Sequence, residues 1–235
     1  MRMTSTKFAP VAQGVYPSPV HAPYKSTRLR GPLQSALRVG APAASLPAFQ
    51  IPLALVKPLD ADLTAQGAGV PLGEKIGVTG RVVDEDGLPV THSLIEVWQC
   101  NSAGRYFHSK DQHAAPLDPN FFGFGKFLTD ENGRYRFITI KPAAYPWGNH
   151  PNAWRPAHIH FSLFGNVYAQ RLVTQMYFPG DPLHVLDPIF NSIYDERARQ
   201  SLVAQFSIEE SVGDVMLGYT FDIVLRGRAA TPLGL

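Results

Sequence analysis

The sequence predicts a mostly β protein: a two-sheet antiparallel β-sandwich with long loops, one or two short helices and an extended N-terminal arm. From about residue 75, short segments alternate apolar with polar residues, and the tight-turn pairs Asp86-Gly87 and Asn132-Gly133 separate some of them. With 45% hydrophobic and 17% charged residues among 235, the chain can bury one complete core. We therefore expect one β-sandwich domain over residues 60–235, preceded by an arm over residues 1–59.

The arm differs in composition from the domain. It carries seven Lys or Arg residues and no acidic residue. A basic, acid-free N-terminus resembles a transit peptide, but the prolines of this arm prevent the amphipathic helix that such a peptide needs. Among these prolines are Pro10, Pro17, Pro19, Pro23 and Pro32. We expect the arm to pack either on the body or on a partner, and we favour an arm that wraps around a partner chain.

The individual elements follow from local patterns of residues. The expected strands cover residues 76–83, 93–99, 126–129, 134–138, 158–164, 171–178 and 219–226. One helix is expected over residues 195–206, because Ala198, Leu202 and Phe206 recur on one face. Residues 80–90 followed by Ile95-Glu96-Val97-Trp98 are similar to strand pairs in transthyretin-like and prealbumin-like sandwiches. Many proteins of that kind only bind ligands, so a non-catalytic binding module remains one alternative.

Several function classes are excluded or disfavoured by composition. The net charge of +2 is too small to indicate nucleic-acid binding. Apolar stretches such as Leu53-Ala54-Leu55-Val56 are too short to span a bilayer, and the N-terminus lacks the apolar core of a signal peptide. We therefore expect a cytoplasmic protein. Cys100 is the only cysteine, so an internal disulfide or a thiolate metal cluster is impossible. Any metal must use nitrogen and oxygen ligands.

The segment Trp154-Arg155-Pro156-Ala157-His158-Ile159-His160 is the strongest candidate for a functional site. On a strand, His158 and His160 project to the same side, about 6.6 Å apart, and can converge on one metal ion. By itself, such a pair is more often two hydrogen-bonded histidines on a half-exposed strand. A zinc hydrolase that uses the pair is a further alternative.

The wider pattern resembles the intradiol ring-cleaving dioxygenases. The resemblance is carried by Trp98-Gln99-Cys100-Asn101, Gly104-Arg105-Tyr106, Tyr145-Pro146-Trp147, Arg155 to His160 and Gln175-Met176-Tyr177-Phe178. Two further segments, Tyr24-Lys25-Ser26-Thr27 and residues 221–227, resemble the protocatechuate-cleaving branch of that family. The resemblance to this family implies a β-sandwich that binds non-haem Fe(III) through Tyr106, Tyr145, His158 and His160.

This ligand set suits ferric iron chemically. Fe(III) is a hard ion that prefers anionic oxygen ligands, which two tyrosinates supply. Together with one hydroxide they cancel its charge, and a neutral centre is inexpensive to hold in a buried pocket. A phenol otherwise keeps its proton up to about pH 10, and a bound trivalent cation is sufficient to displace it.

The resemblance also implies roles for other residues. Tyr145 is expected to leave the metal and act as a base when substrate binds. Arg155 is expected beside the substrate ring, where its charge would stabilise developing negative charge. Gln175 is expected near the oxygen pocket. Expected substrate-binding residues are Tyr24, Trp147 and Ile189.

The implied reaction is cleavage of protocatechuate (3,4-dihydroxybenzoate) by O2 to 3-carboxy-cis,cis-muconate. Within the same family, catechol or hydroxyquinol 1,2-cleavage is the alternative. Those relatives begin with a helical dimerisation segment, however, whereas this chain begins with a proline-rich arm. The protocatechuate enzymes pair two homologous chains, of which the β-type chain keeps the full ligand set. The resemblance therefore implies a homologous α chain as partner.

Overall fold

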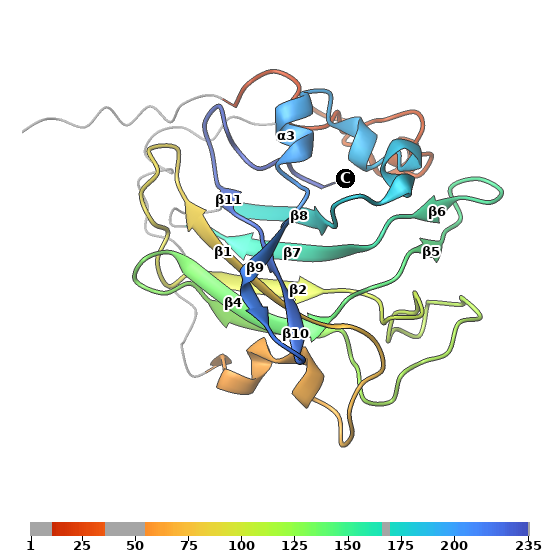
Figure 1. Ribbon diagram of the computed structural model, residues 1–235. Coiled ribbons are helices and arrows are strands. Elements are labelled where there is room, and N and C mark those ends of the chain that lie inside the picture. The colour runs from red at the N-terminus through yellow and green to blue at the C-terminus, as the bar shows by residue number, and fades with distance from the viewer. Residues whose placement is uncertain (1–10, 36–54, 166–169, 235) are drawn as a thin grey trace, which may run out of the picture.

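Two β-sheets packed face to face form the body of the protein in the computed structural model, which describes residues 11–35, 55–165 and 170–234 (Figure 1). The first sheet contains β1 (Lys75–Val83), β4 (Arg134–Ile140), β9 (Gln205–Val212), β10 (Met216–Thr220) and β11 (Ile223–Val224). The second has the order β3 (Phe124–Leu128), β2 (Leu94–Trp98), β7 (His158–Phe164), β8 (Arg171–Tyr177). A two-stranded ladder joins β5 (Tyr145–Pro146) to β6 (Trp154–Arg155).

The described helices are short and lie outside the sheets. They are α1 (Thr27–Arg30), η2 (Pro58–Ala61), η3 (Leu63–Ala65), η4 (Pro182–Leu186), η5 (Phe190–Ser192) and α3 (Glu196–Gln200). None of the helices in the described ranges is long and apolar enough to cross a membrane. The prediction of a mostly β, two-sheet fold with few short helices is confirmed; the likeness to transthyretin-like sandwiches remains a prediction.

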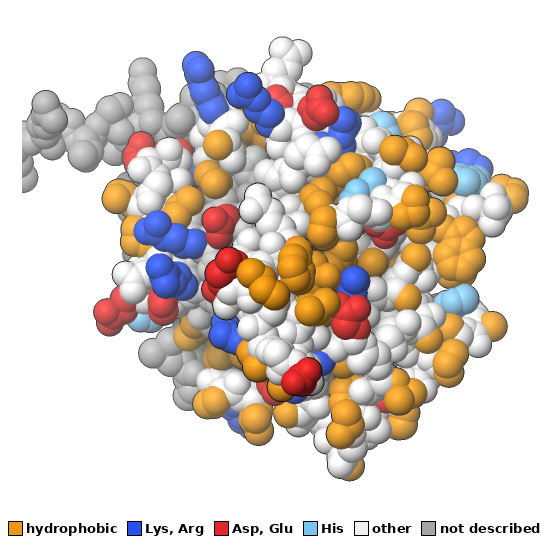
Figure 2. Space-filling model, in the orientation of Figure 1, with side chains coloured by type: hydrophobic (Ala, Val, Ile, Leu, Met, Phe, Trp, Pro, Cys, Tyr) orange, Lys and Arg blue, Asp and Glu red, His pale blue; other side chains and the backbone are white. Residues whose placement is uncertain are grey.

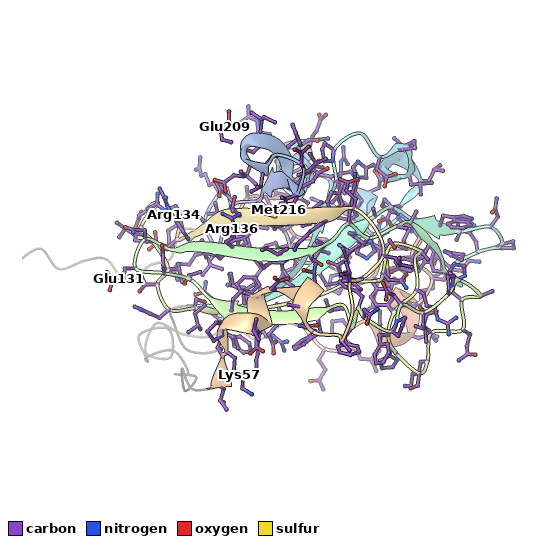
Figure 3. The ribbon with its side chains drawn as sticks, turned by 60° about the horizontal axis from the view of Figure 1, so that its bottom comes forward. Lys57, Glu131, Arg134, Arg136, Glu209 and Met216 are labelled. Atoms are coloured by element: carbon purple, nitrogen blue, oxygen red, sulfur yellow. The ribbon has the colours of Figure 1, made fainter. Side chains whose placement is uncertain are left out.

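The core lies between the two sheets. Alternation along β4 buries Tyr135 and Phe137 while Arg134 and Arg136 are exposed, and Figure 3 labels both arginines along this strand. The Phe137 ring packs edge-on against Phe161 of β7, with 5.9 Å between ring centroids. Full burial of an aromatic side chain contributes about 1.5–3 kcal/mol, so this row of rings holds the sheets together.

One strand departs from a purely antiparallel arrangement. β1 is antiparallel to β4 but runs parallel to both β10 and β11. Well over a hundred residues separate β1 from these partners, so no hairpin turn dictates their direction. The first sheet is therefore mixed, whereas the neighbouring strands of the second sheet are all antiparallel.

The helix expected over residues 195–206 is much shorter than predicted. α3 ends at Gln200, and β9 already begins at Gln205. Tertiary hydrogen bonds account for the difference: the amide of Tyr177 donates to the carbonyl of Leu202, and the amide of Ala204 donates to the carbonyl of Tyr177. Ala198 and Leu202 are buried as expected, but Phe206 is half exposed on an edge strand.

The strand expected over residues 219–226 is divided into β10 and β11. Between them, the amide of Phe221 donates to the carbonyl of Thr79, and the side chain of Asp222 accepts from the amide of Arg81. Gly80 makes this close approach possible, because a Cβ at this position would lie 1.9 Å from the carbonyl oxygen of Phe221. The turns at Asp86-Gly87 and Asn132-Gly133 occur as predicted, with positive φ at both glycines.

Gly80→Ala should destabilise the fold, because backbone on both sides of the contact would have to move. We expect the free energy of unfolding to fall by about 1–3 kcal/mol or more, as for an overpacked core. Gly213→Ala is the matched control, since a methyl group added there would meet no atom within 4 Å among the described residues, apart from its own residue and its two chain neighbours. Chemical denaturation of both variants tests this, and equal stabilities would contradict it.

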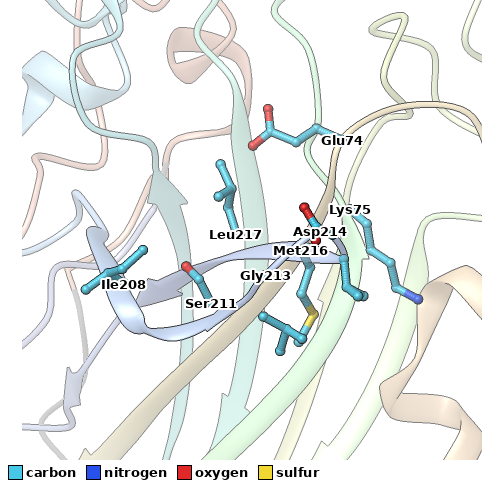
Figure 4. Close-up of a pocket in the computed structure, with 10 residues that line it drawn as sticks. Glu74, Lys75, Ile208, Ser211, Gly213, Asp214, Met216 and Leu217 are labelled. Carbon is cyan, nitrogen blue, oxygen red and sulfur yellow. The ribbon is translucent and has the colours of Figure 1, made fainter.

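The outer face of the first sheet carries apolar side chains around the β9–β10 hairpin (Figure 2). Ile208, Val215 and Leu217 are 67%, 56% and 40% exposed. Together with Glu74, Lys75 and Met216, among others, they line a groove of about 460 Å³ (Figure 4). Its lining includes none of the candidate site residues.

The described part of the arm packs on the body of its own chain. Val15 is buried in a small cluster with Tyr177, Phe190 and Leu202. Further along, the side chain of Asn149 accepts from the amide of Lys25 at 3.0 Å and donates to the carbonyl of Pro23 at 2.8 Å. Residues 1–10 and 36–54 of the arm lie outside the described residues, and its contact with a partner chain remains a prediction.

Candidate metal centre

The four predicted metal ligands come together at one end of the sandwich. His158 and His160 lie at the start of β7, beside the end of β2, where Trp98 pairs with His160. Tyr145 lies on β5, at the same end of the molecule (Figure 1). Tyr106 comes from the loop between β2 and β3, where Asp111 accepts a hydrogen bond from its amide at 2.7 Å. Three separate segments therefore supply the cluster.

The distances are those of one compact cluster. The Nε2 atoms of His158 and His160 are 3.2 Å apart, and the Tyr145 hydroxyl lies 3.5 Å from Nε2 of His158. The rings of Tyr106 and Tyr145 meet edge to face at 5.4 Å, and the Tyr106 ring lies 6.4 Å from the ring of His160. Two imidazole rings and two phenol rings thus lie against one another in one cluster.

Each histidine is held by its surroundings. Nδ1 of His158 lies 2.7 Å from the carbonyl oxygen of Pro156, which requires the proton on Nδ1 and makes Nε2 the nitrogen that carries a lone pair. The His160 ring stacks on Trp98, with 4.7 Å between centroids and 3° between planes. Burial and the charge of Arg155 lower the pKa of His160 to about 3, and burial likewise lowers that of His158 well below its usual value. Both rings are neutral at pH 7, as metal ligands must be.

The tyrosines fit a cation better than they fit one another. The Tyr106 hydroxyl is buried without a hydrogen-bond partner in the described part of the chain. Burial raises the pKa of Tyr106 well above the usual value, and the nearby Tyr145 raises it further. Burial also raises the pKa of Tyr145, although the charge of Arg155 opposes this. A buried, unpaired phenol is costly, and a bound metal ion would remove that cost.

The tyrosines are also necessary if a metal is to bind here. Across residues 11–35, 55–165 and 170–234, no three His, Cys, Asp or Glu side chains gather into a possible metal site. Cys100 is buried, and burial raises the pKa of its thiol to about 12, so it remains a neutral thiol. A donor set of two imidazoles and two phenolates matches a hard trivalent ion such as Fe(III).

Arg155 is buried next to the cluster and is heavily hydrogen bonded. In the β5–β6 ladder it lies directly opposite Tyr145. Its Nη2 donates to Gln175 Oε1 at 2.5 Å and to the Tyr177 hydroxyl at 3.1 Å, and Nε and Nη2 both donate to Asp187 Oδ2. Burial disfavours its charge, but Tyr177, Asp187 and Tyr145 outweigh this and raise its pKa. Arg155 therefore remains a cation.

The other predicted residues lie around this arginine. Gln175 is buried opposite His160 on β8, with its carbonyl oxygen bound to Arg155 and Tyr177. The Trp147 ring lies 5.4 Å from the guanidinium of Arg155 and 5.2 Å from the ring of Tyr24. Ile189 is buried, and its amide donates to Asp187. The Nε1 atom of Trp147 is buried without a partner among the described residues.

Three residues that contact the predicted site residues were not themselves predicted as part of the site. Asp187 has no exposed surface and pairs with Arg155, Tyr177 is almost fully buried beside both, and Trp98 stacks on His160. Tyr177 shares the odd-numbered face of β8 with Gln175, and that alternation could have indicated it. Asp187 precedes a proline in a loop, where an aspartate usually indicates only a turn.

The buried neutral histidines should make the metal-free protein sensitive to acid. Below a pH of about 6.5 the unfolded chain binds protons at His158 and His160 that the native state rejects, so stability falls as pH falls. Each histidine contributes up to about 1.4 kcal/mol per pH unit. We expect urea unfolding at pH 5.5 to show a loss of about 2–3 kcal/mol relative to pH 7.5 from this pair. A His158→Gln/His160→Gln variant should lack the part of this pH-dependent loss that comes from the two histidines. If the unfolding free energy of both proteins fell equally between pH 7.5 and pH 5.5, the two histidines would not be its cause.

Known proteins identify the class to which this fold and cluster belong. A family model described as dioxygenase matches residues 46–227, so the chain belongs to that family. It is 25% identical to 3-chlorocatechol 1,2-dioxygenase from Rhodococcus opacus, with a TM-score of 0.54 over 78% of this chain and 74% of that one. The predicted membership of the intradiol dioxygenases is confirmed.

Two curated relatives place the chain more closely within the family. It is 56% identical over 220 residues to the protocatechuate 3,4-dioxygenase beta chain of Burkholderia cepacia, covering 93% of each chain. It is 34% identical to hydroxyquinol 1,2-dioxygenase of a Rhizobium species, covering 68% of this chain and 56% of the relative. The similarity to the beta chain thus extends over nearly the whole sequence.

Proposed function

We propose that this chain is the catalytic β subunit of an enzyme that cleaves 3,4-dihydroxybenzoate between its two hydroxyl-bearing carbons. Both atoms of O2 enter the product, 3-carboxy-cis,cis-muconate, so no external reductant is needed. The observation that carries the proposal is the convergence of His158, His160, Tyr106 and Tyr145 in a chain so similar to a protocatechuate 3,4-dioxygenase beta chain.

We assign Fe(III) to this cluster, with Tyr106, Tyr145, His158 and His160 as its ligands. When bound, ferric iron would supply Lewis-acid activation of the chelated aromatic diol towards O2. The unpaired hydroxyl of Tyr106 and the unprotonated Nε2 of His158, which faces His160 and Tyr145, support this assignment. Two tyrosinates and a hydroxide would balance the charge of the ion within a buried site.

Tyr145 would act as the base in proton transfer. As a phenolate it would accept a proton from a substrate hydroxyl and become a neutral phenol. Its position opposite Arg155 favours the phenolate form, because the adjacent positive charge lowers the phenol pKa against the effect of burial. Tyr106 would remain bound as a phenolate throughout, and the bound cation would supply the counter-charge that its buried hydroxyl lacks among the described residues.

Arg155 and its neighbours would form the wall of the substrate pocket. A fixed guanidinium next to the ring would stabilise negative charge that develops during the reaction. Trp147 lies between Arg155 and Tyr24, so these three side chains form a continuous surface from the buried site to the arm. We assign Trp147, Tyr24 and Ile189 to substrate binding and Gln175 to the oxygen-binding side, where it contacts Arg155.

We further propose a homologous α chain as partner, because the relative that is 56% identical is a beta chain. The arm would contribute to that interface. Purification of the chain alone as a fully active monomer would contradict this part of the proposal.

The decisive test is colour together with turnover. The protein co-expressed with its partner should be red-brown from tyrosinate-to-iron charge transfer and should consume O2 with protocatechuate much faster than with catechol. Tyr106→Phe should weaken the band and reduce kcat by about 100-fold or more, because a charged ligand is lost. Tyr16→Phe is the control, since Tyr16 belongs to the arm and packs against the small cluster that contains Val15. A folded, colourless and iron-free protein would refute the proposal, and a preference for catechol would favour the alternative substrate class.

A further inference from the structure

Asp187 is a buried carboxylate whose position suggests a role beyond stability. Its side chain has no exposed surface, and both of its oxygens are used. Oδ2 accepts from Arg155 Nη2 at 3.0 Å, from Arg155 Nε at 3.2 Å and from the Tyr177 hydroxyl at 3.3 Å. Oδ1 accepts from the amide of Ile189 at 3.1 Å. The carboxylate of Asp187 thus connects Arg155 to the turn that follows η4.

Asp187 is itself fixed by its backbone. Its amide donates to the carbonyl of Leu183 at 3.1 Å, at the end of η4. Its carbonyl accepts from the amide of Asn191 at 3.0 Å and from the side chain of Asn191 at 2.8 Å. With backbone and side chain both constrained, the carboxylate can serve as a rigid anchor for the guanidinium.

The contact with Asp187 leaves one guanidinium nitrogen of Arg155 available to bind another group. Nε and Nη2 of Arg155 are occupied by Asp187, Gln175 and Tyr177, whereas Nη1 makes no hydrogen bond within the described part of the chain. The Trp147 ring lies 5.4 Å from the guanidinium. Because a guanidinium is planar, fixing two of its nitrogens also fixes the direction of the third.

We propose that Asp187 is a positioning residue, which orients Arg155 so that Nη1 is presented to the substrate. This inference rests on the proposed ring-cleaving function. A pre-organised donor stabilises developing charge without first losing rotational freedom, and displacement by about 1 Å can cost ~100-fold in rate. The carboxylate also balances the charge of Arg155, so that the ion pair as a whole adds no net charge beside the metal cluster.

The test starts with Asp187→Asn in the iron-loaded complex with the partner chain. We expect kcat for protocatechuate to fall ~10- to 100-fold while KM changes less than about threefold, because the arginine is displaced but binding is retained. Iron content and the tyrosinate band should be unchanged. Asp195→Asn is the matched control, because Asp195 caps α3 through the amide of Ala198 in the same way that Asp187 binds Ile189. It should keep kcat within twofold.

A double-mutant cycle separates positioning from general stabilisation. If Asp187 acts through Arg155, then Asp187→Asn should lower kcat by less than twofold in an Arg155→Lys background. The proposal would be overturned if the kcat losses of Asp187→Asn and Arg155→Lys multiplied in the double variant. It would also be overturned if folded Asp187→Asn kept the wild-type kcat. If Asp187→Asn does not assemble, Tyr177→Phe removes one hydroxyl from the same network. It should lower kcat about three- to tenfold, and an unchanged kcat would overturn the proposal equally. Absence of ring cleavage by the wild-type complex would instead refute the proposed function.

Discussion

His160→Ala should abolish iron binding at ordinary metal concentrations and reduce turnover below detection. Its Nε2 lies 3.2 Å from that of His158, at the centre of the cluster, and no other described His, Cys, Asp or Glu group can replace it. Changes to residues that merely orient a metal ligand cost 10- to 100-fold in affinity, so loss of the ligand itself should cost more than ~100-fold. Metal analysis after dialysis, together with the visible absorption band, measures this directly.

His150→Ala is the matched control for that experiment. It makes the same chemical change at an exposed histidine in the loop between β5 and β6, where Nδ1 of His150 lies 2.8 Å from the carbonyl oxygen of the adjacent Pro151. Iron content and kcat should remain within twofold of wild type. If His160→Ala retained iron as the control does, His160 would not be a ligand, and the assignment of the cluster would have to change.

Arg155→Met should be one of the most destabilising single substitutions in this chain. It would leave Asp187, with no exposed surface, as an uncompensated buried charge. Removing one partner of a buried ion pair costs about 3–5 kcal/mol, whereas replacing both partners by apolar residues is often neutral. We therefore expect this loss in the metal-free protein by chemical denaturation, and recovery of most of it in Arg155→Met/Asp187→Leu.

A surface pair provides the comparison. Lys126 and Asp60 are 3.8 Å apart, with 33% and 26% of their side chains exposed. Lys126→Met removes a cation from an ion pair in the same way, but solvent screens this pair, so the expected change is about 0–1 kcal/mol. If Arg155→Met cost no more than Lys126→Met, burial of the Arg155–Asp187 pair would contribute little to stability.

Much of the fold was predictable because its signals are local. Alternating residues define β1, β4 and β7, and Asp86-Gly87 and Asn132-Gly133 mark turns. The same local reasoning is wrong over residues 195–206, where helical periodicity continues past Gln200. There the backbone of residues 202–204 pairs with Tyr177 of β8, and a contact between such distant segments leaves no periodic signal.

The candidate site was predictable in a different way. The spacing of His158 and His160 alone indicates a shared direction on a strand, but Tyr106 and Tyr145 entered through resemblance to a family. The β5–β6 ladder has only two residues on each side, too few to show alternation, yet it sets Tyr145 opposite Arg155. Asp187 lies 32 residues from Arg155. Neither contact could be read from spacing, because both depend on how loops pack.

The attachment of the arm to Asn149 has a consequence for how the protein folds. The hydrogen bonds from Asn149 to Lys25 and Pro23 join residues 124 and 126 positions apart. Joining such distant segments costs chain entropy, and a similar loss opposes the pairing of β1 with β10 and β11. Those pairings are stabilised by strand ladders and a buried core, whereas this attachment rests on two hydrogen bonds and one ring contact. Tyr24 lies between Pro23 and Lys25, so its contact with Trp147 belongs to the same attachment. The sandwich and the metal ligands should therefore assemble first, and the binding wall on the arm side should be the last part of the site to form.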